Sequence, residues 1–236
     1  MQTQSSVKSF VRTHLPTGLV NALRKVRYRR TPIKEIFTDL YYEPVRDQEM
    51  ISGPGSDREQ TAVIAREIPK LLAELQVRSM LDAPCGDFYW MRHVTLPVTR
   101  YVGVDIVDDL ITRHRAAFAN EKREFHCLDL SEDPLPQTEL IHSRDLLVHL
   151  SHRDALRVLA NFKRTGAQYL LTTTFVEESA NEDIMTGGWR PLNLQLPPYN
   201  FPPPLRLINE MCSEDGNRYP DKSLGLWRLA DLRIAE

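Results

Sequence analysis

Carboxylate side chains recur in the sequence just after short apolar segments of the kind that form buried β-strands. Asp82 and Asp105 end the first two of these segments. Asp129 follows the third segment, and Arg144-Asp145 follows the fourth. In an open parallel sheet, ligands bind in the crevice outside the carboxyl ends of the strands. We therefore expect these acids to form one rim of a ligand-binding site.

A histidine lies four residues after the last of these acids. In a helical turn, Asp145 and His149 would share one side, so that the carboxylate could orient an imidazole base. An alcohol that acts as a nucleophile benefits from such a base. We therefore predict that His149 and Asp145 form a catalytic pair. Two alternatives are that His149 only packs against the apolar turn at 146–150, and that His152 serves as the base instead.

Residues 176–204 lack a clear helix or strand pattern and contain six prolines between Pro191 and Pro204. An irregular segment of this length is usually functional in a compact domain. Trp189, Arg190 and Asn193 supply an aromatic ring, a guanidinium and an amide, which suit a polar acceptor such as a sugar. We predict that these three residues bind the substrate. The alternatives are that Trp189 pins the loop to the core and that Arg190 pairs with a phosphate or carboxylate.

A loop of small residues, SGPGS at 52–56, precedes the first of the apolar segments. Gly53, Gly55 and Ser56 can expose backbone N–H groups to a carboxylate, and Arg58 could pair with the same group. The alternative is a plain loop that leads into a helix.

The elements that must position these residues alternate between strand and helix patterns. Apolar residues from Ile64 to Leu75 repeat at helical spacing. Ser151 and Asp154 have the spacing of a capping box, and Gly166 is a typical end of the helix that follows. Strands separated by helices predict an open, doubly wound and mostly parallel α/β sheet, with an antiparallel strand at its C-terminal end. The predicted strands are 78–83, 100–105, 124–128, 140–143, 168–175, 205–212 and 224–229.

This arrangement resembles the class I S-adenosylmethionine-dependent methyltransferases. In that class a glycine turn after the first strand approaches the cofactor, an acid ending the second strand binds the ribose, and an acid after the third reaches the adenine. The strings LDAPCGDFYW, SGPGS and RDLLVHL look like one bacterial family of this class with an unassigned substrate, over roughly residues 36–229. The resemblance implies a Rossmann-like methyltransferase fold and S-adenosyl-L-methionine as cofactor. The cofactor-binding residues that it implies are Gly53, Gly55, Ser56, Asp82, Ala83, Pro84, Gly86, Asp105, Ile106, Asp129, Leu130 and Arg144.

The turn after the first strand departs from the pattern of that class. The usual Gly-x-Gly-x-Gly is replaced by Pro84-Cys-Gly-Asp-Phe88, which keeps only the central glycine, Gly86. We expect Phe88 to pack beside the cofactor or under the loop. The alternative is a closed turn that admits no nucleoside, which would leave a non-catalytic scaffold. A nicotinamide site is a weaker interpretation, because it needs Gly-x-Gly-x-x-Gly.

The charge is distributed unevenly along the chain. The 236 residues carry a net charge of −2, but residues 1–30 hold seven basic residues and no acid. The remaining chain has 23 basic against 32 acidic residues. A basic amphipathic arm over 1–35 is therefore predicted ahead of a methyltransferase domain over 36–236, which contains the acceptor-binding insert at 176–204. Such an arm can contact an anionic membrane or nucleic acid, or it can simply face water.

Composition also limits the class of protein. No run of 18 apolar residues predicts a membrane span, and the three cysteines are too few and too widely spaced for a disulfide framework or a metal site. We expect a cytoplasmic protein that can contact a membrane peripherally, although an Arg-rich start is also typical of organellar transit peptides. The predicted function is methylation of an oxygen on a polar small molecule or glycan. The alternatives are an RNA-modifying or RNA-binding protein and a non-catalytic scaffold.

Overall fold

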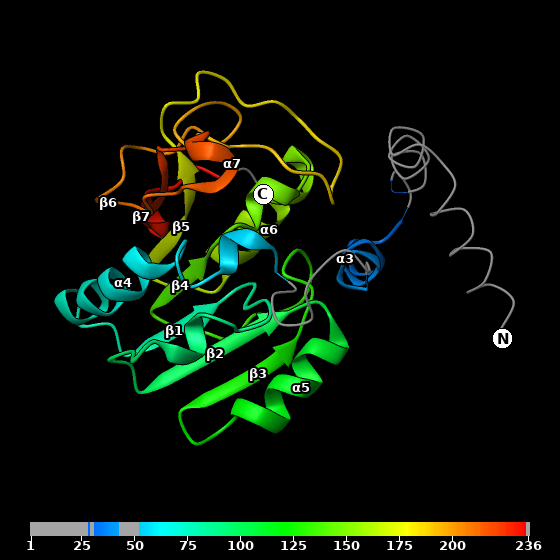
Figure 1. Ribbon diagram of the computed structural model, residues 1–236, viewed down its shortest axis with the longest axis vertical. Helices are drawn as coiled ribbons and strands as arrows, with labels where there is room; N and C mark the ends of the chain where they lie inside the picture. Colours follow the sequence, from blue (N-terminus) through cyan, green and yellow to red (C-terminus); the bar gives the residue numbers. More distant parts are fainter. Residues whose placement is uncertain (1–27, 29–30, 43–51, 235–236) are drawn as a thin grey trace, which may run out of the picture.

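The computed structural model describes residues 28, 31–42 and 52–234, which form a seven-stranded sheet with helices on both faces (Figure 1). The strand order is β3-β2-β1-β4-β5-β7-β6. The order reverses between β1 and β4, and such a reversal opens a crevice at the carboxyl ends of the strands. The strands are β1 (Ser79–Asp82), β2 (Arg100–Asp105), β3 (Arg123–Cys127), β4 (Leu140–Ser143), β5 (Tyr169–Phe175), β6 (Arg206–Asn209) and β7 (Lys222–Arg228).

The sheet confirms the predicted fold class. Strands β1 to β5 pair in parallel, while β7 pairs antiparallel with both β5 and β6. All seven strands fall where the apolar segments predict them. β5 is buried along nearly its whole length, as expected for a strand covered on both faces.

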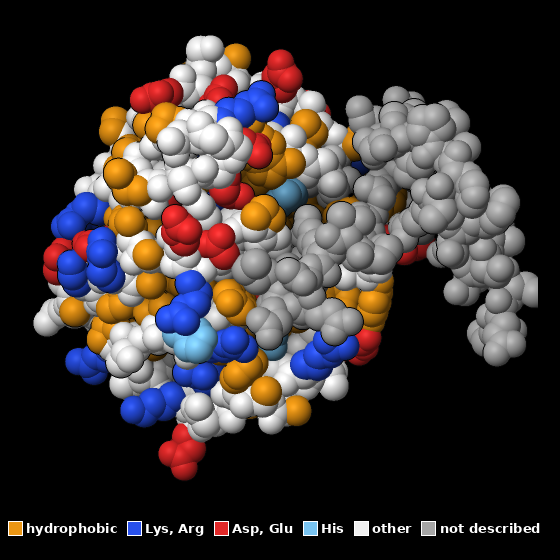
Figure 2. Space-filling model, in the orientation of Figure 1, with side chains coloured by type: hydrophobic (Ala, Val, Ile, Leu, Met, Phe, Trp, Pro, Cys, Tyr) orange, Lys and Arg blue, Asp and Glu red, His pale blue; other side chains and the backbone are white. Residues whose placement is uncertain are grey.

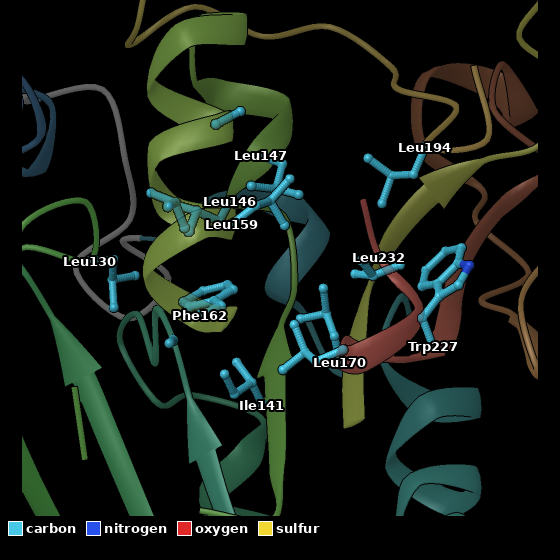
Figure 3. Packing of buried hydrophobic residues seen from close by; sticks show 14 of the residues in the cluster. Leu130, Ile141, Leu146, Leu147, Leu159, Phe162, Leu170, Leu194, Trp227 and Leu232 are labelled. Carbon is cyan, nitrogen blue, oxygen red and sulfur yellow. The ribbon is translucent and has the colours of Figure 1, made fainter. Parts of the chain in front are cut away.

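Two hydrophobic clusters lie on opposite faces of the sheet. One contains the inward residues of α4 (Ala62–Glu74) and Ile111 of α5 (Asp108–Phe118), together with Met80 and Tyr101 from the strands. The other contains Leu159 and Phe162 of α6 (His152–Arg164), which pack on Ile141 and Leu170 (Figure 3). The helices are α3 (Ile33–Tyr41), α4 (Ala62–Glu74), α5 (Asp108–Phe118), α6 (His152–Arg164) and the short α7 (Glu214–Asn217), with 3-10 turns at Pro54–Ser56, Met91–His93, Leu147–His149 and Leu229–Asp231.

Helix α6 begins and ends as its sequence predicts. The Ser151 hydroxyl accepts a hydrogen bond from the backbone N–H of Asp154 at 3.2 Å, which satisfies one of the unpaired donors of the first turn. Gly166 follows the helix with a φ of +73°, a conformation that a side chain would strain. Both ends of α6 are therefore set by its own sequence.

The predicted boundary between arm and domain falls inside a helix. α3 begins at Ile33 and continues to Tyr41, so residues on both sides of position 35 form one element. The arm itself lies almost entirely outside the described residues. Among the residues that the structure describes, no helix is both long and apolar enough to cross a membrane.

The predicted insert at 176–204 packs into the core of the domain. Leu192, Leu194, Tyr199 and Phe201 are buried in the same cluster as α6. Trp227 of β7 donates its indole N–H to the Pro202 carbonyl at 2.7 Å. The segment is therefore an irregular but anchored wall, which can hold a side chain in a fixed position beside the sheet.

Candidate active site

A cavity of about 520 Å³ opens at the carboxyl ends of the strands, next to the point where the strand order reverses. This volume is typical of small-molecule sites. The cavity wall joins the strand ends to α3 and to residues 187–189. The predicted site residues that line it are Ser56, Asp82, Pro84, Gly86, Asp105, Ile106, Asp129, Leu130, Arg144, Asp145, His149 and Trp189. Gly53, Gly55, Ala83, Arg190 and Asn193 do not line it.

Asp105 stands at the end of β2 with unused acceptor capacity. Its Oδ1 accepts the Val107 N–H at 3.0 Å, and its Oδ2 accepts the Gly86 N–H at 3.2 Å. A carboxylate oxygen has two lone pairs, so each oxygen can accept one more hydrogen bond from a ligand. Burial raises the pKa of Asp105 to about 6, against the opposing effect of these backbone hydrogen bonds.

Asp129 is held after β3 by its own turn. Its Oδ1 accepts both the backbone N–H of Ser131 at 2.8 Å and the Ser131 hydroxyl at 2.7 Å. The second oxygen, Oδ2, accepts none of the hydrogen bonds among the described residues. Asp129 therefore has a fixed orientation and one carboxylate oxygen available to a donor such as an amino group.

The turn after β1 requires its single glycine. Gly86 has a φ of +53°, and a Cβ atom there would lie 2.6 Å from the Ser52 hydroxyl. Ser52 and Asp87 form two reciprocal bonds, from Ser52 N to Asp87 Oδ2 at 3.0 Å and from Asp87 N to Ser52 Oγ at 2.9 Å. On the other side, the His114 ring donates to the Gly86 carbonyl at 2.7 Å. The turn is thus held open from two sides.

Phe88 packs under this turn and not in the cavity. Its ring is buried against Tyr101, His114, Phe118 and Phe125. The prediction placed Phe88 either beside the cofactor or under the loop, and in the structure it lies under the loop. The closed turn that was the alternative is absent from the described residues, because the residues from Pro84 to Asp87 line the cavity.

Two backbone N–H groups of the SGPGS loop donate hydrogen bonds within the protein and are therefore not available to a ligand. The Ser56 N–H donates to Gly53 O at 3.0 Å, and the Ser52 N–H goes to Asp87 as described above. Only Ser52 and Ser56 of this loop reach the cavity. Arg58 lies instead in a neighbouring groove, where it is joined by Arg66, Lys70 and His93. Figure 2 shows Lys and Arg side chains that gather around a histidine on one face of the molecule.

Arg144 forms the centre of a buried charge cluster. Its guanidinium donates to Glu210 at 2.6 Å and to the Gly55 carbonyl at 2.9 Å, and it lies 3.3 Å from Asp145. Lys222 reaches Asp145 at 2.9 Å. Burial disfavours the charge on Arg144, but Glu210 and Asp145 outweigh it and raise the pKa of Arg144 above its ordinary value. Arg144 therefore joins the SGPGS loop to the segment after β6, although it also touches the cavity.

The carboxylate of Asp82 is already occupied by the protein. It accepts hydrogen bonds from the Tyr101 hydroxyl and from His142 Nδ1, the latter at 2.7 Å. All three side chains are buried. Asp82 lines the cavity, and its two oxygens each hold a side chain of a neighbouring strand, Tyr101 of β2 and His142 of β4.

His149 and Asp145 lie near each other without the predicted helical turn. Asp145 has a φ of +55°, and a 3-10 turn from Leu147 to His149 follows it. Burial opposes ionisation of Asp145, but Arg144 and Lys222 outweigh it and hold its pKa well below the ordinary value. The His149 ring is oriented by the Gly188 carbonyl, 2.7 Å from Nδ1. The partner that orients the imidazole thus differs from the one predicted.

The insert contributes one of its three predicted residues to the cavity. Trp189 is 43% exposed and packs against Tyr219, with ring centroids 4.9 Å apart. Arg190 is buried and donates to the carbonyls of Leu147 and Val148 at 3.1 Å. Asn193 donates to the carbonyls of residues 176 and 178. Arg190 and Asn193 therefore hold the loop in place, a structural role that is common for buried polar side chains.

Helix α3 forms a wall of the cavity that the sequence analysis missed. Ile33, Phe37, Leu40 and Tyr41 line the cavity, and their spacing of four, three and one is the signature of one helical face. On the same face, Ile36 packs on the insert, where a Cβ atom at Gly187 would lie 2.7 Å from Ile36 Cγ2. The apolar spacing of these residues is visible in the sequence, but it crosses the boundary predicted at residue 35 between arm and domain.

Comparisons with known proteins identify the fold. No family model matches the chain, and no curated relative matches it. The chain is similar to the structure of human N-acetylserotonin methyltransferase in complex with S-adenosylmethionine, with a TM-score of 0.59 and 13% identity over 89% of this chain. It spans 65% of the length of that protein.

Two bacterial structures overlap with smaller parts of the chain. N-methyltransferase NodS from Bradyrhizobium japonicum has a TM-score of 0.47 and 14% identity, over 59% of this chain and 73% of its own. Magnesium protoporphyrin IX methyltransferase from Synechocystis has a TM-score of 0.45 and 13% identity, over 65% of this chain and 81% of its own. Of these three similarities, the one to N-acetylserotonin methyltransferase covers the most of this chain, but its 13% identity is too low to show a shared function. It establishes the fold: the chain has the Rossmann-like α/β fold found in S-adenosylmethionine-dependent methyltransferases.

Proposed function

We propose that the protein is an S-adenosylmethionine-dependent methyltransferase. The observation that carries this proposal is the pair of carboxylates, Asp105 and Asp129, that end neighbouring strands and keep lone pairs directed at one cavity beside the Gly86 turn. Adjacent strands lie about 4.8 Å apart, so the two acids suit the ribose hydroxyls and the base of one nucleoside. The fold shared with N-acetylserotonin methyltransferase supports the same assignment.

The residues present fit this cofactor in charge as well as in position. Asp82, Asp87, Asp105 and Asp129 line the cavity, and the charge of Arg144 is already countered by Glu210 and Asp145. An acidic wall favours a cationic ligand. When bound, S-adenosylmethionine supplies a methyl group on a positively charged sulfur, and the protein contributes orientation and a base.

His149 is the residue proposed as the base. Because a carbonyl oxygen only accepts, the Gly188 carbonyl fixes the hydrogen of the imidazole on Nδ1. Nε2 is then the basic nitrogen, and it can take a proton from an acceptor hydroxyl in the cavity. Asp145 contributes negative charge near His149 without acting as the group that orients it.

The proposed acceptor is a polar small molecule or glycan that is methylated on oxygen. Trp189 offers an exposed aromatic face at the cavity wall, and α3 adds Ile33 and Phe37. Aromatic faces stack on the apolar faces of sugar rings, while hydroxyls are free to meet His149.

Calorimetry with S-adenosylmethionine and S-adenosylhomocysteine tests the proposal. We expect the wild type to bind both ligands, and Asp105→Asn to weaken both by about 100-fold, because the acceptor loses its charge and one of its two oxygens becomes an NH2 group, which donates. Mass spectrometry of acceptor pools incubated with the protein and S-adenosylmethionine should then show a gain of one methyl group. Wild-type protein that binds neither nucleoside and shows no response to Asp105→Asn would leave the non-catalytic scaffold as the better description.

The protein is proposed to work in the cytoplasm and to touch an anionic membrane through residues 1–30. The support for this proposal is the run of seven basic residues without an acid. Vesicles that contain phosphatidylserine should bind the full chain, and the triple substitution Lys8→Ala, Arg12→Ala, Lys25→Ala should weaken that binding. If the substitutions leave vesicle binding unchanged, the arm has no such role.

A further inference from the structure

A buried histidine that lies outside the predicted site has one ring nitrogen without a partner. His142, on β4, is 1% exposed and stands opposite Asp82 of β1 in the parallel register. Its Nδ1 lies 2.7 Å from Asp82 Oδ1. Its Nε2 is buried and has no hydrogen-bond partner among residues 28, 31–42 and 52–234. A buried polar atom without a partner costs free energy, so this nitrogen requires an explanation.

The hydrogen bonds around Asp82 determine what the unpartnered nitrogen can do. Tyr101 donates its hydroxyl to one oxygen of Asp82, and His142 Nδ1 donates to the other. A carboxylate accepts and does not donate, so the ring hydrogen lies on Nδ1. In the neutral ring, Nε2 then carries a lone pair and acts as an acceptor. The Asp82–Tyr101 pair holds His142 in the tautomer that accepts at Nε2.

The position of His142 along the rim indicates which part of a ligand can reach it. The strand order puts Asp129 after β3, Asp105 at the end of β2, and His142 on β4, one strand beyond β1. At about 4.8 Å per strand, His142 lies about 14 Å from the adenine side of the rim. An elongated nucleoside would therefore present its far end, and not its ribose, to this histidine.

The charges at this end favour a cationic group. Asp82 and Asp87 lie in the same part of the cavity wall, while Arg144, the nearby cation, is neutralised by Glu210 at 2.6 Å and Asp145 at 3.3 Å. An ammonium group is both a hydrogen-bond donor and the complementary charge.

We propose that His142 Nε2 accepts a hydrogen bond from the α-ammonium group of the bound cofactor, with Asp82 and Tyr101 as positioning residues. This inference rests on the proposed function, since it assigns one end of the same cavity. Asp82 acts on the ligand through the imidazole, which one of its oxygens positions while the Tyr101 hydroxyl donates to the other.

The test compares three nucleosides that differ at this end. S-adenosylhomocysteine has both the amino and the carboxyl group, its decarboxylated form keeps only the amino group, and 5′-methylthioadenosine lacks both. His142→Asn can still donate to Asp82 but has nothing at the position of Nε2, whereas His142→Gln reaches that position with an amide. Calorimetry on the full chain, with thermal unfolding to verify that each variant is folded, gives the affinity for each ligand.

We expect His142→Asn to weaken the two amino-bearing ligands by about tenfold and to leave 5′-methylthioadenosine unchanged. His142→Gln should recover part of the loss, and Tyr101→Phe should weaken the same two ligands by a few-fold only. Equal losses for all three nucleosides would overturn the assignment, as would a loss for S-adenosylhomocysteine alone, which would point to the carboxylate. If the wild type binds none of the three, the proposed function itself fails, and this result is distinct from the other two.

Discussion

The two halves of the cavity are built by different means. In the nucleoside half, Asp105, Asp129 and Gly86 follow directly from strand ends and short turns. In the acceptor half, α3 and residues 187–189 come from segments far apart in the sequence, and Arg190 and Asn193 use their hydrogen bonds on the chain itself. Sheet topology therefore fixes the first half, whereas loop packing fixes the second. The same fold can keep one half constant and vary the other.

The largest expected effect is a loss of stability at the buried charge cluster around Arg144. Arg144 joins the SGPGS loop to Glu210, which is 2% exposed. Arg144→Met leaves Glu210 buried without its principal partner, so we expect the free energy of unfolding to fall by about 3–5 kcal/mol. Urea denaturation measures this loss. Arg144→Lys keeps the charge but not the fork of donors, and it should lose less; equal stability of all three proteins would show that the buried cluster does not stabilise the fold.

Substitution of His149 should lower kcat without changing the affinity for the cofactor. Because His149 lines the cavity beside Trp189 and is oriented by the Gly188 carbonyl, we expect His149→Ala to lower kcat by about 100-fold or more while the Kd of S-adenosylhomocysteine stays within about twofold. Methyl transfer assays and calorimetry give the two quantities. His152→Ala is the matched control, since the His152 ring is bonded to Tyr199 at 3.0 Å. Parallel losses in kcat and affinity, or a larger effect at His152, would contradict the assignment of the base.

The same contrast explains what could be predicted from the sequence. The strands, the cap at Ser151 and the strand-end acids were predictable, because alternation of apolar and polar segments sets the sheet and the sheet sets its rim. The contacts of Arg190 and Asn193 were not, since residue type alone does not tell whether a polar side chain bonds a ligand or a backbone carbonyl. His142 was missed because its neighbours, Asp82 and Tyr101, come from strands whose register only the structure gives.

The nucleoside half should respond to pH through Asp105. Folding raises its pKa to about 6, so without ligand the folded state holds this proton more tightly than the unfolded chain. The stability that results is present below the ordinary pKa and is lost as pH rises towards 6.

The affinity for the ligand, in contrast, should increase as the pH rises. The ionised carboxylate accepts the ribose hydroxyls, so the Kd of S-adenosylhomocysteine should rise about tenfold for each pH unit below 6. Calorimetry between about pH 5 and about pH 8 tests this, and Asp105→Asn should lose that dependence. A wild-type Kd that is flat across this range would show that Asp105 does not bind the nucleoside.

The smallest effect is expected in the acceptor half, at Trp189. This ring is partly exposed and rests on Tyr219 and Phe175, with centroids 4.9 Å and 6.1 Å away, so removing it costs contact area without leaving a buried charge. Trp189→Ala should raise the KM for the acceptor by several-fold, up to about tenfold, with no change in the Kd of S-adenosylhomocysteine. Leu205→Ala is the control, because Leu205 is 54% exposed and lies outside the cavity wall. If Trp189→Ala changed the affinity for the cofactor, the two halves of the cavity would be coupled through the insert. The division into one half fixed by sheet topology and another fixed by loop packing would then be wrong.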